Sequence, residues 1–201
     1  MKLSSWSEAS IPALQERGFR KRKPHEFVRV LNGVVQVVSF QGKKKDIHIW
    51  VNALPLSLPE LNLNQGWLDV ADRAPGKENT WNVSSGDEAE IHNIQNGLRD
   101  ALLSEAIPKL DRLGALQELH GAFNESFLPF AAWPKAFCML QLGELGRAKE
   151  HLQEVLSDPI RWPRFPLIKN YLAADVNQIQ ALVADQIKEN IKSLRLQRWV
   201  T

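Results

Sequence analysis

Two carboxylates and an arginine lie close together in the middle of the chain. Asp69, Asp72 and Arg73 come just before a proline–glycine turn. A carboxylate pair beside an arginine can act as a general acid and base. Together with His48, these side chains would form a catalytic or nucleic-acid-processing site if the fold brought them into one concave pocket. A structural ion pair is the alternative, and it is the commoner arrangement.

A second candidate site is aromatic and lies on an expected strand. Trp50 alternates with Ile49 and Val51, so it shares a face with His48 and Asn52. An aromatic side chain on the polar face of a sheet can anchor a protein partner, and it can equally be covered by the C-terminal helices. The candidate partner-binding residues are Trp50, His48, Arg73, Trp81, Asp69 and Asp72.

Two basic runs flank the first expected strands. Arg20-Lys21-Arg22-Lys23 and Lys43-Lys44-Lys45 could contact nucleic acid or an acidic protein partner. They could also be solvated turn residues that blunt the edge of a sheet. Because 25 basic and 23 acidic residues give a formal net charge of only +2, we expect solvated residues rather than a nucleic-acid-binding patch.

The sequence lacks the motifs of other common chemistries. Its five histidines include no chelating pair on one helical turn and it has no cysteine pair, so we expect neither a metal nor a cofactor. A nucleophile elbow, a P-loop and a dinucleotide fingerprint are all missing. The single cysteine, Cys138, lies in an apolar run and is expected to be a buried core thiol. No catalytic residue is therefore predicted.

Length and composition indicate a folded intracellular protein. With 201 residues, of which 44% are hydrophobic, the chain can bury a core without disulfides or a metal. Its first residues lack the continuous apolar stretch of a signal peptide, and no apolar run approaches the length of a membrane span. We expect a cytoplasmic protein with no membrane association. The sequence leaves its oligomeric state open.

A helix and an antiparallel meander must position the candidate residues of the first half. We expect a helix over residues 5–17 that kinks or starts late at Pro12. It should cover one face of the sheet that follows. Asn32-Gly33 predicts a type I′ hairpin turn, because both central positions of that turn need positive φ. The expected strands are residues 25–31, 34–41 and 47–53, with two shorter ones at 67–71 and 81–83.

Helices are expected from Asp87 to the end of the chain. A Ser84-Ser85-Gly86 turn should cap the first of them. Residues 134–142 and 146–157 are typical of a helical hairpin. Two apolar stripes are expected, one of Ile91, Ile94, Leu98 and Leu102, and one on a long final helix of Leu172, Val176, Ile179, Val183, Ile187, Ile191 and Leu194. The predicted fold class is α+β, with an α+β domain over 1–120 and a helical extension over 121–201, or one continuous domain.

A pattern of short segments runs through the first half of the chain. Its parts are Gly18-Phe19-Arg20-Lys21, Phe27-Val28-Arg29, the strand from Val35 to Gln41, Ile47 to Val51, Asp72-Arg73 and Trp81. Over roughly residues 5–115 this pattern resembles a bacterial family, domain-of-unknown-function family 4304. The resemblance implies a helix, an antiparallel sheet and further helices, but that family brings no agreed activity, cofactor or catalytic residues. The chain departs from the pattern in its long loop from Leu54 to Gly66 and in its extra C-terminal helices.

A second pattern lies in the expected helical hairpin and consists of Leu142-Gly143, Leu145, Ala148, Leu152, Val155 and Pro159. It resembles a single tetratricopeptide-type hairpin. Such arrays need neighbouring repeats to bury their faces, so a generic helical hairpin is the expected outcome.

The sequence favours binding over catalysis. We predict a non-enzymatic bacterial protein-binding module, and one concrete form is an immunity or antitoxin-like protein that binds and neutralises a toxin. The alternative is an enzyme or nucleic-acid-processing protein that uses Asp69, Asp72, Arg73 and His48. A third hypothesis is nucleic-acid binding through the two basic runs.

Overall fold

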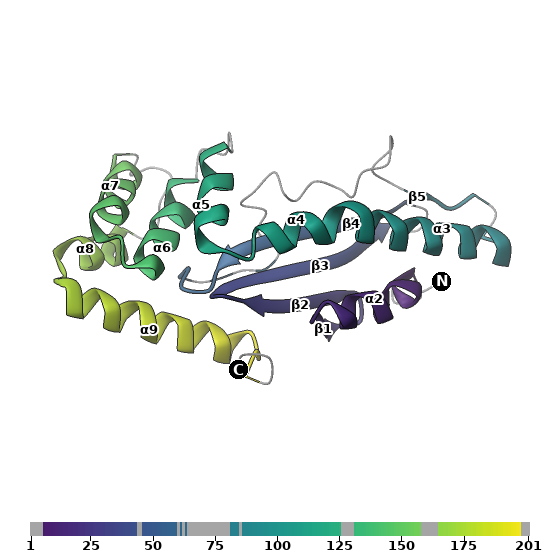
Figure 1. The fold of residues 1–201 in the computed structure, drawn as a ribbon, viewed down its shortest axis with the longest axis horizontal. Helices are drawn as coiled ribbons and strands as arrows, with labels where there is room; N and C mark the ends of the chain where they lie inside the picture. The colour runs from purple at the N-terminus through teal and green to yellow at the C-terminus, as the bar shows by residue number, and fades with distance from the viewer. Residues whose placement is uncertain are drawn as a thin grey trace. The chain divides into compact units, whose positions relative to one another are not determined.

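The computed structural model describes residues 6–43, 46–59, 61, 63, 81–84, 86–125, 131–157 and 165–197. The fold is α+β, as expected, with an antiparallel sheet and a helical C-terminal half (Figure 1). The chain divides into two compact units. We call residues 1–29, 36–53 and 70–112 the sheet unit, and residues 30–35, 54–69 and 113–201 the helical unit. These units interleave along the chain, whereas the expected domains are contiguous segments.

Residue 5 lies outside the described residues, but Trp6 is helical, so the helix start expected at residue 5 stays a prediction. A 3₁₀ turn, η1 (Glu8–Ser10), leads into α2 (Ile11–Glu16). Pro12 lies in the first turn of α2, where its missing N–H removes no helical hydrogen bond. Pro12 therefore lies at the start of α2, which is separated from the helical residue Trp6 by Ser7 and η1, and it does not kink a continuous helix. Gly18, at φ 81°, then turns the chain into the first strand.

In the part of the chain that the structure describes, five strands lie side by side in chain order, which confirms the expected meander. The Asn32-Gly33 turn has φ values of 47° and 78°, as a type I′ turn requires. Trp81 lies opposite Ile47 in the last strand pair. The strand expected at 67–71 lies outside the described residues. The strands are β1 (Arg20–Lys23), β2 (Glu26–Leu31), β3 (Val34–Lys43), β4 (Asp46–Pro55) and β5 (Trp81–Asn82).

One face of the sheet is covered by helices of the sheet unit. α3 (Glu88–Ala101) continues through a π-helical segment (Leu102–Ala106) into α4 (Ile107–Arg112), and these helices run along the sheet (Figure 1). η1 packs against α3. The first helix therefore shares this face with α3 and α4 rather than covering it alone.

The N-cap of α3 is Asp87, whereas the sequence led us to expect a cap from the Ser84-Ser85-Gly86 turn, and at its other end α3 continues as a helix past Pro108. Asp87 Oδ1 accepts from the Glu90 backbone N–H at 2.8 Å, and the Glu90 carboxylate accepts from the Ser84 and Gly86 backbone N–H groups. Pro108 does not end the helix. The wider π turn immediately before it accommodates a residue that cannot donate to the preceding turn.

The helical unit is built from consecutive helices that pack on their neighbours in sequence. α5 packs on α6, α6 on α7 and α7 on α8, and α6 also contacts α9. Gly143, at φ 79°, closes α6 and allows the tight α6–α7 hairpin. Cys138 is buried, as expected. The bounds are α5 (Leu116–Glu125), α6 (Ala132–Leu142), α7 (Leu145–Leu156), α8 (Phe165–Ala173) and α9 (Val176–Ser193).

The stripe expected on the long final helix is partly wrong. Ile179 and Val183 are buried, but Val176 is 54% exposed at the helix start. A polar residue, Asn190, lies buried instead, because its Nδ2 donates to the carbonyls of Leu56 and Leu58 at 2.7 and 2.8 Å. These two bonds satisfy backbone carbonyls of a segment that forms no helix or strand there.

Replacing Gly33 by alanine is expected to lower the free energy of unfolding by about 2–3 kcal/mol. The added Cβ would lie 1.9 Å from Gln141 Nε2, and the alanine backbone would have to keep the positive φ of the turn. The clash would displace Gln141, whose Nε2 donates to the Gly33 carbonyl at 2.9 Å and whose Oε1 accepts from the Ser57 N–H at 3.2 Å.

The matched control for this substitution is Gly121→Ala. Gly121 lies within α5, and a Cβ added there would have no neighbouring atom within 4 Å. The control should stabilise the protein by about 0.5–1 kcal/mol through helix propensity. Urea unfolding followed by circular dichroism measures both variants, and equal midpoints would contradict the packing of Gln141 on the turn.

Candidate functional site

The aromatic candidate site on β4 is half-buried. Ile47, Ile49 and Val51 are buried on one face, as expected. His48 and Trp50, on the other face, are half-buried. Trp50 is thus neither a core side chain nor a fully exposed anchor. The side chain of Trp81 lies outside what the structure describes.

The carboxylate–arginine candidates lie outside the described residues. Asp69, Asp72 and Arg73 belong to the stretch 64–80, which the structure does not describe. Their convergence with His48 therefore stays a prediction, and so does the enzymatic alternative that depends on it.

The first basic run forms an edge strand rather than a turn. β1 is the outermost strand of the described sheet and pairs with β2, with Arg20 opposite Val28. Arg20, Lys21 and Lys23 are exposed, and Arg22 is half-buried. The run therefore lies at a solvated sheet edge. Of the second run, Lys43 ends β3, while Lys44 and Lys45 lie outside the described residues.

A buried glutamate holds part of this basic strand in place. Glu26 is only 2% exposed, and its carboxylate pairs with Arg22 and with Lys23, the latter at 3.4 Å. Arg22 is therefore structural, because it neutralises a carboxylate that burial alone would destabilise. Arg20 and Lys21 make no ion pair with Glu26 and are exposed, and Lys23 is exposed as well although it pairs with Glu26.

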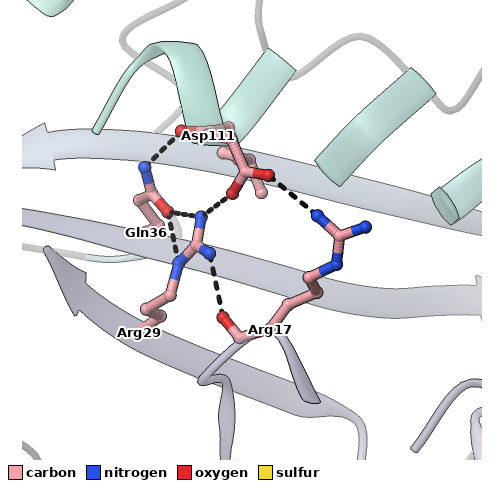
Figure 2. Close-up of polar contacts among 5 residues, drawn as sticks. Arg17, Arg29, Gln36 and Asp111 are labelled. Atoms are coloured by element: carbon pink, nitrogen blue, oxygen red, sulfur yellow. Dashed lines mark hydrogen bonds and ion pairs between the residues drawn. The ribbon is translucent and has the colours of Figure 1, made fainter. Parts of the chain in front are cut away.

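The sheet unit contains a polar cluster around Arg29 that was not predicted from the sequence. We call it the Arg29 cluster (Figure 2). The Arg29 guanidinium donates to Gln36 Oε1 at 2.8 Å, to Asp111 Oδ1 at 2.7 Å and to the Arg17 carbonyl at 2.9 Å. Arg17 also pairs with Asp111 at 3.3 Å, and Gln36 donates to the Leu110 carbonyl. The cluster joins the end of α2, two strands and α4.

The geometry of the Arg29 cluster favours a structural role. The Arg29 side chain is only 11% exposed, and its guanidinium carbon lies 4.5 Å from the centroid of the Phe19 ring. Its donors already point at three acceptors, so an incoming carboxylate or phosphate would have to displace Asp111. The hairpin register offered one signal, because a two-residue turn at Asn32-Gly33 puts Arg29 opposite Gln36.

Two histidines meet in the helical unit, although they are far apart in sequence. His120 on α5 and His151 on α7 have their Nε2 atoms 3.1 Å apart and their ring centroids 5.3 Å apart. Burial, followed by the neighbouring His151, lowers the pKa of His120 to about 4. Burial, followed by the charge of Lys135, also lowers the pKa of His151. Both rings are therefore neutral at neutral pH.

The described residues contain no group of three or more histidine, cysteine, aspartate or glutamate side chains arranged to hold a metal ion. Among them, too, no helix combines the length and the apolar character needed to cross a membrane. Comparisons with protein-family models, with curated proteins and with solved structures returned no match to this chain.

Proposed function

We propose that this protein acts by binding another protein, and that the exposed edge of β1 makes the contact. The observation that carries the proposal is the basic edge strand itself, where Arg20, Lys21 and Lys23 are exposed at the outermost strand of the described sheet. The outer backbone groups of an edge strand can pair with a strand of a partner. The three cations favour an acidic segment and disfavour a basic one.

The helical unit supports a binding role by analogy of architecture. Helices that pack on their sequence neighbours, as α5, α6, α7 and α8 do, can form extended scaffolds for protein recognition. The tight α6–α7 hairpin, with Ala148, Leu152 and Val155 buried, fits the tetratricopeptide-type pattern of the sequence. Because folds of this kind host many functions, this analogy supports binding without naming the partner.

A more specific form of the proposal is an immunity or antitoxin-like protein that neutralises a toxin. Its support is the general analogy with small bacterial α+β proteins that lack catalytic motifs. The resemblance to domain-of-unknown-function family 4304 likewise stays a prediction. A toxin-like gene directly before the gene for this chain would support the immunity form, and a neighbourhood without one would count against it.

The triple variant Arg20→Gln/Lys21→Gln/Lys23→Gln is expected to weaken binding to an acidic polypeptide by about 10- to 100-fold. Each exposed charge contact contributes about 0.5–1 kcal/mol, and three of them are removed. Arg22 is left in place so that the buried Glu26 carboxylate keeps one ion pair when its other partner, Lys23, is replaced. The probe is a fluorescently labelled glutamate-rich peptide, and the dissociation constant is measured by anisotropy at low salt.

The matched control removes the same charge from α9 and the residues just after it. Lys188→Gln/Lys192→Gln/Arg195→Gln changes three exposed cations of the helical unit and should bind the peptide like the parent protein. If both triple variants weakened peptide binding equally, the loss of affinity would come from net charge alone, and the proposed role of β1 would be wrong. Tighter binding of a DNA duplex than of the peptide would replace the proposal with nucleic-acid binding.

A further inference from the structure

We propose that His120 and His151 form an acid-sensitive lock that joins α5 to α7 and opens when both imidazoles become protonated. The contact links two helices that both pack on α6. It is independent of the basic edge strand, so its failure would leave the proposed protein-binding function untouched.

The distance between the rings fixes how many protons the pair can hold. A hydrogen bond between two Nε2 atoms at 3.1 Å needs one ring to donate and the other to accept. If both rings were protonated, two N–H groups and two positive charges would face each other across that distance. The closed pair is therefore incompatible with the doubly protonated state.

The outer nitrogens also have partners, and these indicate where the protons of the two rings lie. His120 Nδ1 lies 3.4 Å from Asn124 Nδ2, and His151 Nδ1 lies 3.7 Å from Glu154 Oε2. We infer that Asn124 donates to His120, that His120 donates to His151, and that the His151 Nδ1–H points to the carboxylate. Each ring then carries a single proton, and the chain of donors runs in one direction.

The charged groups around the pair mostly oppose its protonation. Lys135 from α6 and Arg147 from α7 are positive and lower the pKa of both rings. Glu144, at the start of α7, acts in the opposite direction on His120, and Glu154 does so on His151. Desolvation is the largest cause at both rings, and His120 is only 5% exposed.

The direction of the pH dependence follows from these lowered pKa values. In the open or unfolded chain each imidazole titrates near 6.5, whereas in the closed pair His120 titrates near 4. Above pH 6.5 the full contribution of the pair to stability is present. As the pH falls from 6.5 toward 4, the open form binds protons that the closed form does not, so opening is favoured.

The test measures the opening of α5 and α7 by amide hydrogen exchange with mass spectrometry, corrected for the intrinsic effect of pH on exchange. Between pH 7.5 and pH 5, the opening constant of peptides from these helices should rise at least about tenfold. In the double variant His120→Gln/His151→Gln, which cannot titrate at these positions, most of this increase should disappear. The control variant His92→Gln removes an exposed histidine of α3 and should retain the increase of the opening constant at low pH.

Two outcomes would overturn the proposal. One is an opening constant of the parent protein that does not change with pH, and the other is an unchanged pH dependence in the double variant. If the double variant does not fold, nuclear magnetic resonance titration of the parent protein decides the matter. An imidazole of His120 that titrates below pH 5 supports the lock, and one that titrates near 6.5 in the folded protein rejects it.

Discussion

Replacing Arg29 by methionine is expected to lower the free energy of unfolding by about 3–5 kcal/mol. Methionine fills part of the volume but donates no hydrogen bond, so Gln36 Oε1 and the Arg17 carbonyl lose their donor. Asp111 loses its shorter ion pair, although its partial exposure lets water compensate in part. Urea unfolding followed by circular dichroism measures the change.

The control for this prediction is Arg112→Met, which removes an exposed arginine one residue after Asp111. That change should stay within about 0.5 kcal/mol of the parent protein. In a double-mutant cycle, Arg29→Met and Asp111→Asn together should cost at least about 1 kcal/mol less than the sum of the single changes. Additive effects, or equal effects of Arg29→Met and Arg112→Met, would contradict the contacts of the Arg29 cluster.

Replacing Phe137 by alanine is expected to cost the helical unit about 3–5 kcal/mol. Phe137 is fully buried and makes edge-to-face contacts with two aromatic rings. Its ring centroid lies 4.7 Å from that of Trp133 and 5.3 Å from that of Tyr171. Alanine would remove the transfer free energy of the ring, leave a cavity between α6 and α8, and abolish both aromatic contacts. Hydrogen exchange of peptides from α6, α7 and α8 locates the loss.

The matched control is Val176→Ala at the exposed start of α9. It removes apolar atoms that are already largely in water, so its effect should stay within about 0.5 kcal/mol. If Phe137→Ala unfolded at the same urea concentration as this control, the aromatic contacts between α6 and α8 would not hold the unit together. A loss of protection confined to the sheet unit would contradict the placement of Phe137 as well.

Local patterns predicted most of the sheet but missed its first strand. The Asn32-Gly33 turn and the alternation of Ile47, Ile49 and Val51 determine the register, because turn geometry and burial act over a few residues. The segment Arg20–Lys23 has no apolar alternation. It forms a strand because β2 offers it backbone partners and because Glu26 pairs with two of its cations, and neither cause is visible in the segment itself.

The polar clusters could be predicted from sequence only where one strand pair forms them. The opposition of Arg29 and Gln36 follows from the hairpin register. The contact of Arg29 with Asp111 and the meeting of His120 with His151 depend on how separate helices pack. Periodicity identifies the apolar face of each helix, but it does not give the pairing of polar residues that border two such faces.

The π-helical segment at Leu102–Ala106 sets the phase of the helix that covers the sheet. Ile94, Leu98, Leu102, Ala106 and Leu110 are all buried and recur every fourth residue. In a regular α-helix four residues rotate about 40° beyond a full turn, so such a stripe would wind off the sheet within a few turns. The wider π turn adds a residue without the matching rotation and brings the stripe back. The continuous helix from α3 to the end of α4 therefore keeps the same face toward the sheet. As a result, Asp111 lies where it accepts a hydrogen bond from Arg29.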